Sequence, residues 1–261
     1  MATNKRKIHV IGISSFEFKE LPKKLQKLFI ATDKIAVPNS YFQKIKSWNE
    51  PNIKNKKLFF ASESNDKLFI WLKSQQTDVI LISRGDPLWF GIGRLLLENF
   101  SREELCFYPS NTCMQIAFSK FKKPWQDTSF ISIHGRETSK LIESLKSKPS
   151  SLGIITDSKN RGLEIIKNNL LELKLEGYYD FWLCEEMGFE NERVRKLKIK
   201  ENLPTDISDL NIAILLRKEA SKTPNEIPLF GVKDDTFKTF EDRPNLLTKR
   251  EIRVQILADL E

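Results

Sequence analysis

The sequence has few of the residues from which metal centres and disulfides are built. It contains two histidines and three cysteines, Cys106, Cys113 and Cys184, and no two cysteines are spaced as C-x-x-C. A structural zinc site usually takes four Cys or His ligands, so this composition disfavours one and we expect no metal. We expect the three cysteines to be reduced thiols, as in a cytosolic protein.

Long apolar runs and dense clusters of positive charge are also missing. The first seven residues are polar and lack the apolar stretch of a signal peptide, and no apolar run approaches the roughly 20 residues that span a bilayer. We therefore expect a cytoplasmic protein without a membrane partner. The formal net charge of +8 attracts anions of any kind, including a polycarboxylate ligand. Because Lys and Arg are scattered, we expect no nucleic-acid partner.

What the sequence does contain is a regular alternation of β-rich runs and amphipathic stretches, without internal repeats. This alternation predicts an α/β fold with largely parallel sheets. The expected strands are residues 7–13, 78–83, 105–108, 129–134, 152–156, 178–183 and 211–216, and the expected helices are residues 20–31, 90–100, 111–121 and 160–173.

Changes in composition predict three regions. The polar stretch 137–151 is the best boundary between an N-terminal α/β domain, 1–136, and a C-terminal α/β domain, 137–217. The third region, 218–261, is expected to be a linker and the start of a truncated downstream region, and its residues 218–245 are rich in Pro, Asp and Thr. Residues 248–251 read T-K-R-E, which has the form of a capping box and predicts a helix start. No stop signal follows this helix, so we expect a fragment of a longer chain; a natural C-terminal helix is the alternative.

The most informative segment, residues 83–93, reads S-R-G-D-P-L-W-F-G-I-G between a predicted strand and a predicted helix. In α/β sheets, ligands bind at the carboxyl ends of the strands. Gly85 allows a positive φ or a close backbone approach, and Pro87 is tolerated at a helix start. Asp86 as a plain helix N-cap is the structural alternative.

This segment resembles the G-D-P-x-x-Y-G motif of the tetrapyrrole methylases, with Phe90 in place of Tyr. Residues 109–117 are similar to the family's P-G-x-[ST]-[SA] block. Residues 124–127 and 132–136 resemble the P-W-x-D and S-x-H-G-R blocks, which are typical of the precorrin-6Y and precorrin-7 methyltransferases. Residues 185–193 are similar to the subgroup's E-N-L-G-x-x-x-E-R. These blocks occur in the family's order, and the resemblance covers residues 7–217.

The resemblance implies two α/β domains with a cleft between them that holds S-adenosylmethionine (SAM). It also implies methylation of a precorrin ring carbon, carbon 5, in cobalamin biosynthesis, with S-adenosylhomocysteine as the product. Most cofactor contacts would come from the backbone. The residues implied for them are Arg84, Gly85, Asp86, Trp89, Thr112, Cys113, Thr156, Gly188 and Ala213.

An anionic tetrapyrrole carries acetate and propionate groups, which arginine binds in a bidentate manner. We therefore expect Arg84, Arg94 and Arg136 to contact the substrate, above a loop that includes Gly12, Ser14 and Ser15.

A proton must also leave at some stage of the reaction, and His134 and Asp86 are the candidate bases. Each candidate has a plainer alternative. His134 could be an ordinary hydrogen-bonded residue, and Arg136 could be a surface ion pair. Trp89 and Trp125 could be core or pocket wall, and Glu185 and Glu186 could be a solvated strand end.

The sequence departs from the family's pattern at two places. The first loop is usually G-x-G-P-G, whereas residues 12–16 read G-I-S-S-F. Two outcomes stay open: binding survives if the replacing residues keep negative φ, or it is weakened. Arg84 stands where the subgroup often has a small residue, so its guanidinium either pairs with a substrate carboxylate or partly fills the pocket.

Residues 235–237 and 247–253 look like the junction of fused bifunctional enzymes, which implies a covalently attached second methyltransferase/decarboxylase domain. The family is usually dimeric, so a homodimer is expected. Two alternatives stay open: another enzyme of the superfamily, acting on uroporphyrinogen, diphthamide precursors or ribosomal RNA, and a basic RNA-binding or scaffold module without catalysis.

Overall fold

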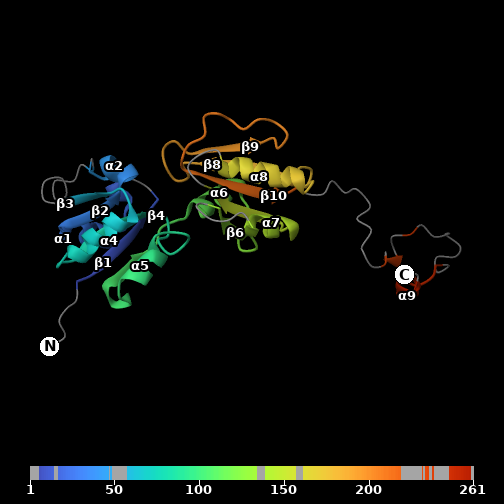
Figure 1. Ribbon diagram of the computed structural model, residues 1–261, viewed down its shortest axis with the longest axis horizontal. Helices are drawn as coiled ribbons and strands as arrows, with labels where there is room; N and C mark the ends of the chain where they lie inside the picture. The colour runs from blue at the N-terminus through green and yellow to red at the C-terminus, as the bar shows by residue number, and fades with distance from the viewer. Residues whose placement is uncertain are drawn as a thin grey trace. The chain divides into compact units, whose positions relative to one another are not determined.

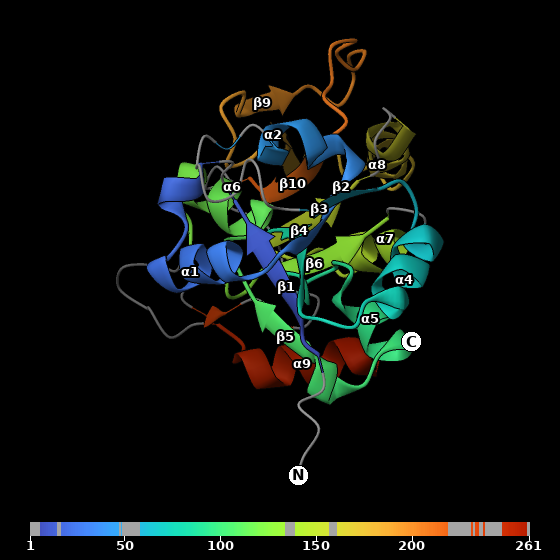
Figure 2. The same ribbon diagram turned by 90° about the vertical axis from the view of Figure 1, so that its left-hand side faces the viewer.

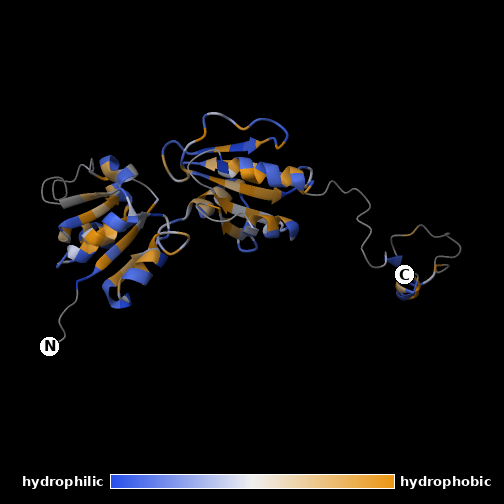
Figure 3. Cartoon of the chain, viewed as in Figure 1, coloured by the Kyte–Doolittle hydropathy of each residue, from blue (hydrophilic) through white to orange (hydrophobic). Residues whose placement is uncertain are grey.

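The computed structural model describes residues 6–14, 17–46, 48, 58–133, 139–156, 161–218, 231, 233–234, 237 and 247–259. The chain divides into two compact units, residues 1–218 and residues 219–261 (Figure 1). The first unit contains two five-stranded sheets, and apolar residues recur along their strands and on the helices (Figure 3). No helix in these described ranges is long and apolar enough to cross a membrane.

The first sheet is parallel throughout, as the alternation predicted. Its order is β3-β2-β4-β1-β5, with β1 at Ile8–Ile13, β2 at Lys34–Pro38, β3 at Leu58–Ser62, β4 at Val79–Arg84 and β5 at Leu105–Tyr108 (Figure 2). The whole of β1 is buried, as expected for a central parallel strand covered on both faces.

Helices cover both faces of this sheet. On one face, alternate strand residues pack with α1 (Lys23–Ala31), α2 (Phe42–Lys46) and the short helices η1 (Phe18–Glu20) and η2 (Asn39–Tyr41). The opposite face packs with α4 (Asn65–Ser74) and α5 (Gly93–Asn99), and η3 (Arg102–Glu104) leads into β5.

The second sheet is mixed, so the expectation of largely parallel sheets is wrong here. Its order is β6-β7-β10-β8-β9, with β6 at Ser129–Ser132, β7 at Ser151–Ile155, β8 at Tyr179–Glu185, β9 at Arg193–Leu197 and β10 at Asn211–Arg217. Only β6 and β7 pair in parallel. The connection from β8 to β9 is too short for a crossover, and β10 enters antiparallel between β7 and β8.

Helices also lie on both faces of the second sheet. On one face, a core that includes Leu141, Ile166 and Leu215 joins the sheet to α7 (Ser139–Lys146) and α8 (Arg161–Glu172). On the other face, α6 (Cys113–Phe121) packs Met114 and Phe118 against residues of β8 and β10.

The polar stretch 137–151 is not a simple linker, because it contains α7. Leu141 and Leu145 of this helix are fully buried, although polar residues surround them in the sequence. The change from the first sheet to the second lies between β5 and β6, ahead of the predicted boundary. The limits 1–136 and 137–217 stay a prediction.

The second unit contains α9 (Arg250–Ala258), which confirms a helix near the predicted place. The predicted capping box is wrong: the N-cap is Lys249, and no side chain caps the helix. Instead, the Arg253 guanidinium pairs with Asp234 at 2.8 Å and lies 4.7 Å from the centre of the Phe237 ring. These contacts tie the first turn of the helix to residues that precede it in the chain.

Burial along α4 predicts how two substitutions of similar size differ. Leu72 is fully buried, whereas Ile70, two residues earlier, is 71% exposed. We expect Leu72→Ala to lower the free energy of unfolding by about 2–5 kcal/mol, because it leaves a cavity between α4 and the first sheet. Ile70→Ala, the matched control, should change it by about 0.5 kcal/mol. Urea denaturation measures both, and equal effects would contradict this packing.

Candidate functional site

The site begins where backbone segments of the first unit touch without side chains between them. A β-carbon built on Gly12 would lie 1.8 Å from the carbonyl oxygen of Gly85. The Gly85 amide donates to the carbonyl of Ile13 at 2.9 Å, and the Ser110 amide donates to the Gly85 carbonyl at 3.3 Å. Gly85 itself has a φ of +58°. Glycine is therefore required at both positions, and the ends of β1 and β4 meet the segment that leads into α6.

A cavity of about 300 Å³ opens beside this contact. Its wall has three sources: the end of β4 with the loop after it, the start of α6, and the neighbouring ends of β7 and β10. The lining residues are Ser83, Arg84, Gly85, Asp86, Trp89, Phe90, Gly91, Thr112, Cys113, Ile155, Thr156, Asp209, Leu210, Asn211 and Ile212. Seven of the nine residues implied for the cofactor are among them.

The other two implied residues, Gly188 and Ala213, lie outside this wall. Ala213 is fully buried and packs in the core towards α7 and α8, because successive strand residues face opposite ways. Its neighbour Ile212 takes the place at the cavity. Gly188 has a φ of +86°, and a β-carbon there would lie 2.7 Å from Ile116 and 3.0 Å from the carbonyl oxygen of Ser14. It serves as a close packing point.

Three predicted residues use their side chains to shape the cavity. Asp86 Oδ1 accepts from the Leu88 amide at 2.9 Å, so it fixes the turn, while the N-cap of α5 is Ile92. Thr112 is the N-cap of α6 and forms a capping box with Gln115. The Thr156 hydroxyl donates to the carbonyl of Asn211 at 2.8 Å and ties β7 to β10. The alternative of Asp86 as a helix N-cap is therefore wrong.

Arg84 lies at the edge of the cavity, near two groups that stay neutral, Tyr41 and Cys113. Its guanidinium is 5.3 Å from the centre of the Phe189 ring. Burial raises the pKa of Tyr41 to about 12, and burial also raises the pKa of the Cys113 thiol, while the nearby Arg84 opposes both shifts. At neutral pH the phenol and the thiol are therefore protonated, and neither neutralises the guanidinium.

The residues expected to contact the substrate are only partly brought together. Gly12 lies at the site, and the Ser110 hydroxyl donates to the Ser14 hydroxyl at 2.8 Å. Ser14 is not among the residues with positive φ, so the loss of that glycine imposes no left-handed backbone. Arg94 lies elsewhere, on the exposed face of α5, and pairs with Glu98 at 2.8 Å. Ser15, His134 and Arg136 lie outside the described residues.

Arg94 does not line this cavity, and its contact with the substrate stays a prediction. The helical spacing explains its position. Arg94 follows the motif closely in sequence, but one helical turn separates it from the cavity and brings Glu98 into reach.

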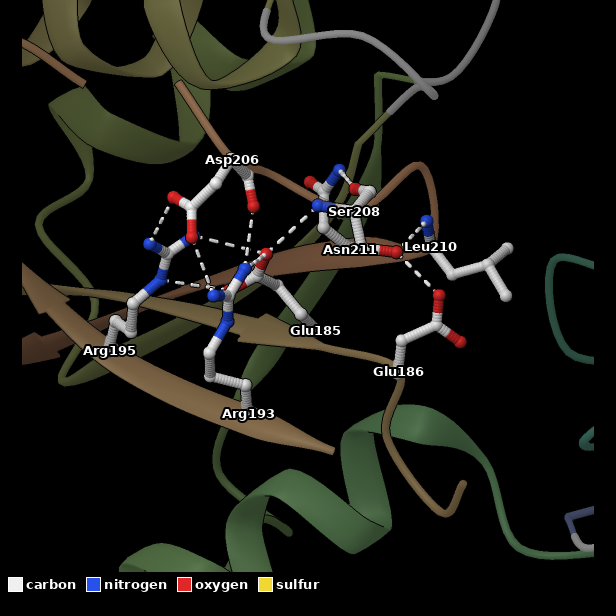
Figure 4. A network of polar contacts seen from close by, with 8 residues as sticks. All are labelled: Glu185, Glu186, Arg193, Arg195, Asp206, Ser208, Leu210 and Asn211. Atoms are coloured by element: carbon white, nitrogen blue, oxygen red, sulfur yellow. Dashed lines mark hydrogen bonds and ion pairs between the residues drawn. The ribbon is translucent and has the colours of Figure 1, made fainter. Parts of the chain in front are cut away.

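A network of ion pairs holds the part of the wall that comes from the second sheet (Figure 4). Glu185, at the end of β8, is 1% exposed and binds both Arg193 and Arg195 of β9 through four hydrogen bonds of 2.9–3.1 Å. Asp206 accepts from the same two guanidinium groups at 2.7 Å each. The interpretation of Glu185 as a solvated strand end is wrong.

This network explains the spacing of the block at residues 185–193. Its first residue, Glu185, pairs with its last, Arg193, while Glu192 accepts from the Gly188 amide at 2.9 Å. Charged residues of this block therefore close the loop between β8 and β9. Glu185 also accepts from the Ser208 amide at 2.9 Å, just ahead of the wall residues 209–212. The sequence analysis missed those wall residues and Ile155, because only strand pairing places them there.

Comparisons with known proteins fit this arrangement. Residues 17–202 match the family model of the Tetrapyrrole (Corrin/Porphyrin) Methylases. The chain is 26% identical over 140 residues to a probable cobalt-precorrin-7 C(5)-methyltransferase of Methanocaldococcus jannaschii, covering 52% of this chain and 64% of that protein. It is 24% identical over 185 residues to the decarboxylating precorrin-6Y C(5,15)-methyltransferase of Sinorhizobium sp, covering 70% of this chain and 42% of that protein.

A solved structure shows the same fold. The uroporphyrin-III C-methyltransferase of Thermus thermophilus, in complex with S-adenosylhomocysteine, has a TM-score of 0.56 at 14% identity, covering 80% of this chain and 97% of that one. The alignments with the two sequence relatives span less than two thirds of the length of each of those proteins.

The ion-pair network predicts a pH dependence of stability. Its two arginines lower the pKa of Asp206 from 3.8 to about 2. Because the pKa is lower in the folded state, Asp206 contributes its full stabilisation above pH 3.8 and loses it as the pH falls towards 2. We expect the wild type to have a higher urea midpoint than Asp206→Asn at neutral pH, with the difference shrinking over that acidic range. Glu201→Gln, an exposed carboxylate paired with Lys198, is the control. A difference that stays constant down to pH 2 would contradict the assignment.

Proposed function

The chain belongs to the tetrapyrrole (corrin/porphyrin) methylase family, and from this premise we propose that it transfers a methyl group from SAM to a ring carbon of a precorrin-type tetrapyrrole. One observation carries the proposal. The glycine of the G-D-P loop, Gly85, lies against the end of β1 and at the wall of a cavity of about 300 Å³. The loop that the family resemblance marks is thus also the loop that shapes the cavity.

The cavity fits the cofactor. Its volume is within the usual range for a small-molecule site, roughly 300–1,000 Å³. At Gly85 the absence of a β-carbon leaves the backbone open to the cavity, and a β-carbon there would lie 3.3 Å from the backbone at Asn111 and Thr112. Trp89, Ile155 and Ile212 add an apolar wall suited to a flat heterocycle. The related structure with S-adenosylhomocysteine supports the same ligand class.

The cofactor would supply a methyl group made electrophilic by the sulfonium, so the protein's task is alignment more than strong acid-base chemistry. The turn at Asp86 and the start of α6 hold the cavity wall in place, and the neutral Cys113 and Tyr41 bring no competing negative charge. Asp86 and Asp209 are the carboxylates among the described wall residues. Asp86 stays our candidate base, together with His134.

The names of the two relatives support the finer proposal that carbon 5 of a precorrin in cobalamin biosynthesis is the methyl acceptor. The blocks at residues 124–127 and 132–136 point to the same subgroup. We also propose a cytoplasmic homodimer with a second methyltransferase/decarboxylase domain in the full-length protein, and a division of residues 1–217 at 136 and 137.

Calorimetric titration with S-adenosylhomocysteine tests the proposal. We expect saturable one-to-one binding by the wild type. Gly85→Arg should abolish detectable binding, because residue 85 has a positive φ and its side chain would enter the cavity wall. Gly177→Arg is the matched control, since no atom lies within 4 Å of a β-carbon at Gly177.

Thermal unfolding of each variant separates a blocked site from a lost fold. Absence of binding by the wild type, or full binding by a folded Gly85→Arg variant, would contradict the proposal. Once binding is established, the gain of one methyl group by a precorrin, followed by mass spectrometry, tests the transfer itself.

A further inference from the structure

Arg84 occupies a special position, because it lines two neighbouring cavities. The first is the 300 Å³ cavity described above. The second, of about 210 Å³, lies at the ends of β2 and β4 and the start of α4, with Leu68, Leu81 and Ile92 in its wall. Ser83 and Arg84 belong to both, so the end of β4 is the partition between two spaces that could each hold part of a ligand.

Among the described residues, the guanidinium of Arg84 has no carboxylate partner, whereas four other arginines of the first unit have one. Arg6 pairs with Glu104, Arg94 with Glu98, and Arg193 and Arg195 with Glu185. Within the part of the chain that the structure describes, Arg84 makes no hydrogen bond or ion pair through its side chain. The guanidinium instead lies over the ring of Phe189, 5.3 Å from its centre. A half-buried guanidinium with unused donors favours an added acceptor.

Three nearby carboxylates interact with groups other than Arg84. Asp86 accepts from the Leu88 amide, and Glu186 accepts from the Ser208 hydroxyl. In the second cavity, Glu63 pairs with Lys67 at 2.6 Å. Lys44 lies 6.0 Å from the centre of the Phe189 ring and adds positive charge on the same ring. No ion pair joins these carboxylates to Arg84, although Asp86 and Asp209 share the first cavity wall with it.

Phe189 also contributes to the setting of the guanidinium, whose central carbon lies 5.3 Å from the centre of the ring, within cation–π range. A guanidinium in this setting still has N–H donors for a bidentate carboxylate. Arginine suits this task better than lysine, because its donors lie in a fixed plane.

We propose that Arg84 receives a carboxylate of a bound ligand at the partition between the two cavities. The inference rests on the proposed function, whose two ligands both carry carboxylates: the amino-acid end of the cofactor, and the acetate and propionate arms of the tetrapyrrole. The shared chemistry is a carboxylate bound by a guanidinium, and the experiment tells the two sources apart.

The test compares three purified variants with the wild type. Arg84→Met removes the charge but keeps an unbranched apolar chain against Phe189. Arg84→Lys keeps the charge without the planar donors. Arg102→Met removes an exposed arginine that lines neither cavity and is the matched control. Thermal unfolding confirms that each variant is folded.

Three probes are titrated: S-adenosylhomocysteine, 5′-methylthioadenosine, which lacks the amino-acid carboxylate, and the polycarboxylate uroporphyrin III. We expect Arg84→Met to weaken a carboxylate-bearing probe by about 10- to 100-fold, Arg84→Lys to restore part of the loss, and Arg102→Met to bind as the wild type does. Binding of 5′-methylthioadenosine should not change.

The pattern identifies the source. Loss for S-adenosylhomocysteine alone assigns Arg84 to the cofactor carboxylate, and loss for uroporphyrin III alone assigns it to the substrate. Unchanged affinity for both carboxylate probes, or an equal loss of affinity for 5′-methylthioadenosine, would overturn the inference. Arg84 would then only fill space in the pocket. Failure of the proposed function would give a different result, because the wild type itself would then not bind S-adenosylhomocysteine. In that case this inference would fail as well.

Discussion

The close approach of two backbone segments at Gly12 and Gly85 is the constraint on which the site depends. Parallel strands β1 and β4 end at the same edge of the first sheet, and any side chain at Gly12 would collide with the carbonyl of Gly85. The hydrogen bond from Ser110 then draws the approach to α6 against the same carbonyl. Position 12 has the glycine that this approach requires. Ser14 is not among the residues with positive φ, so its backbone does not require glycine.

The second sheet completes the site through charge, not through apolar packing alone. Burying Glu185 is favourable only because two guanidinium groups and the Ser208 amide surround it. Those bonds hold β9 and the approach to residues 209–212 at one end of β8. Phe189 and Leu210, which flank this network, pack against the core of the first sheet. The cavity wall is therefore shared by elements of both sheets.

The contrast between elements held by apolar packing and elements held by ion pairs also determines which parts of the fold the sequence predicts. Strands β1, β4 and β5 are apolar runs, and β5 was predicted with its observed limits. Strand β9 was missed because Arg193, Arg195 and Lys196 give it no apolar alternation, and ion pairs hold it instead. Helix α7 was read as a boundary because only two buried leucines mark it. At the site, the motif residues were found, but Ile212 was not, since its place follows from pairing with Ile155.

The position of Arg84 shows how the chain can depart from its family without losing the site. The backbone geometry depends on Gly12 and Gly85, and both are present. Arg84 adjoins Gly85, but its side chain lies against Phe189 and takes no part in that backbone contact. A large cation is therefore compatible with the loop. Because the phenol of Tyr41 and the thiol of Cys113 remain protonated, neither neutralises the positive charge of Arg84 at the cavity edge. This charge affects which ligand binds and not how the loop folds.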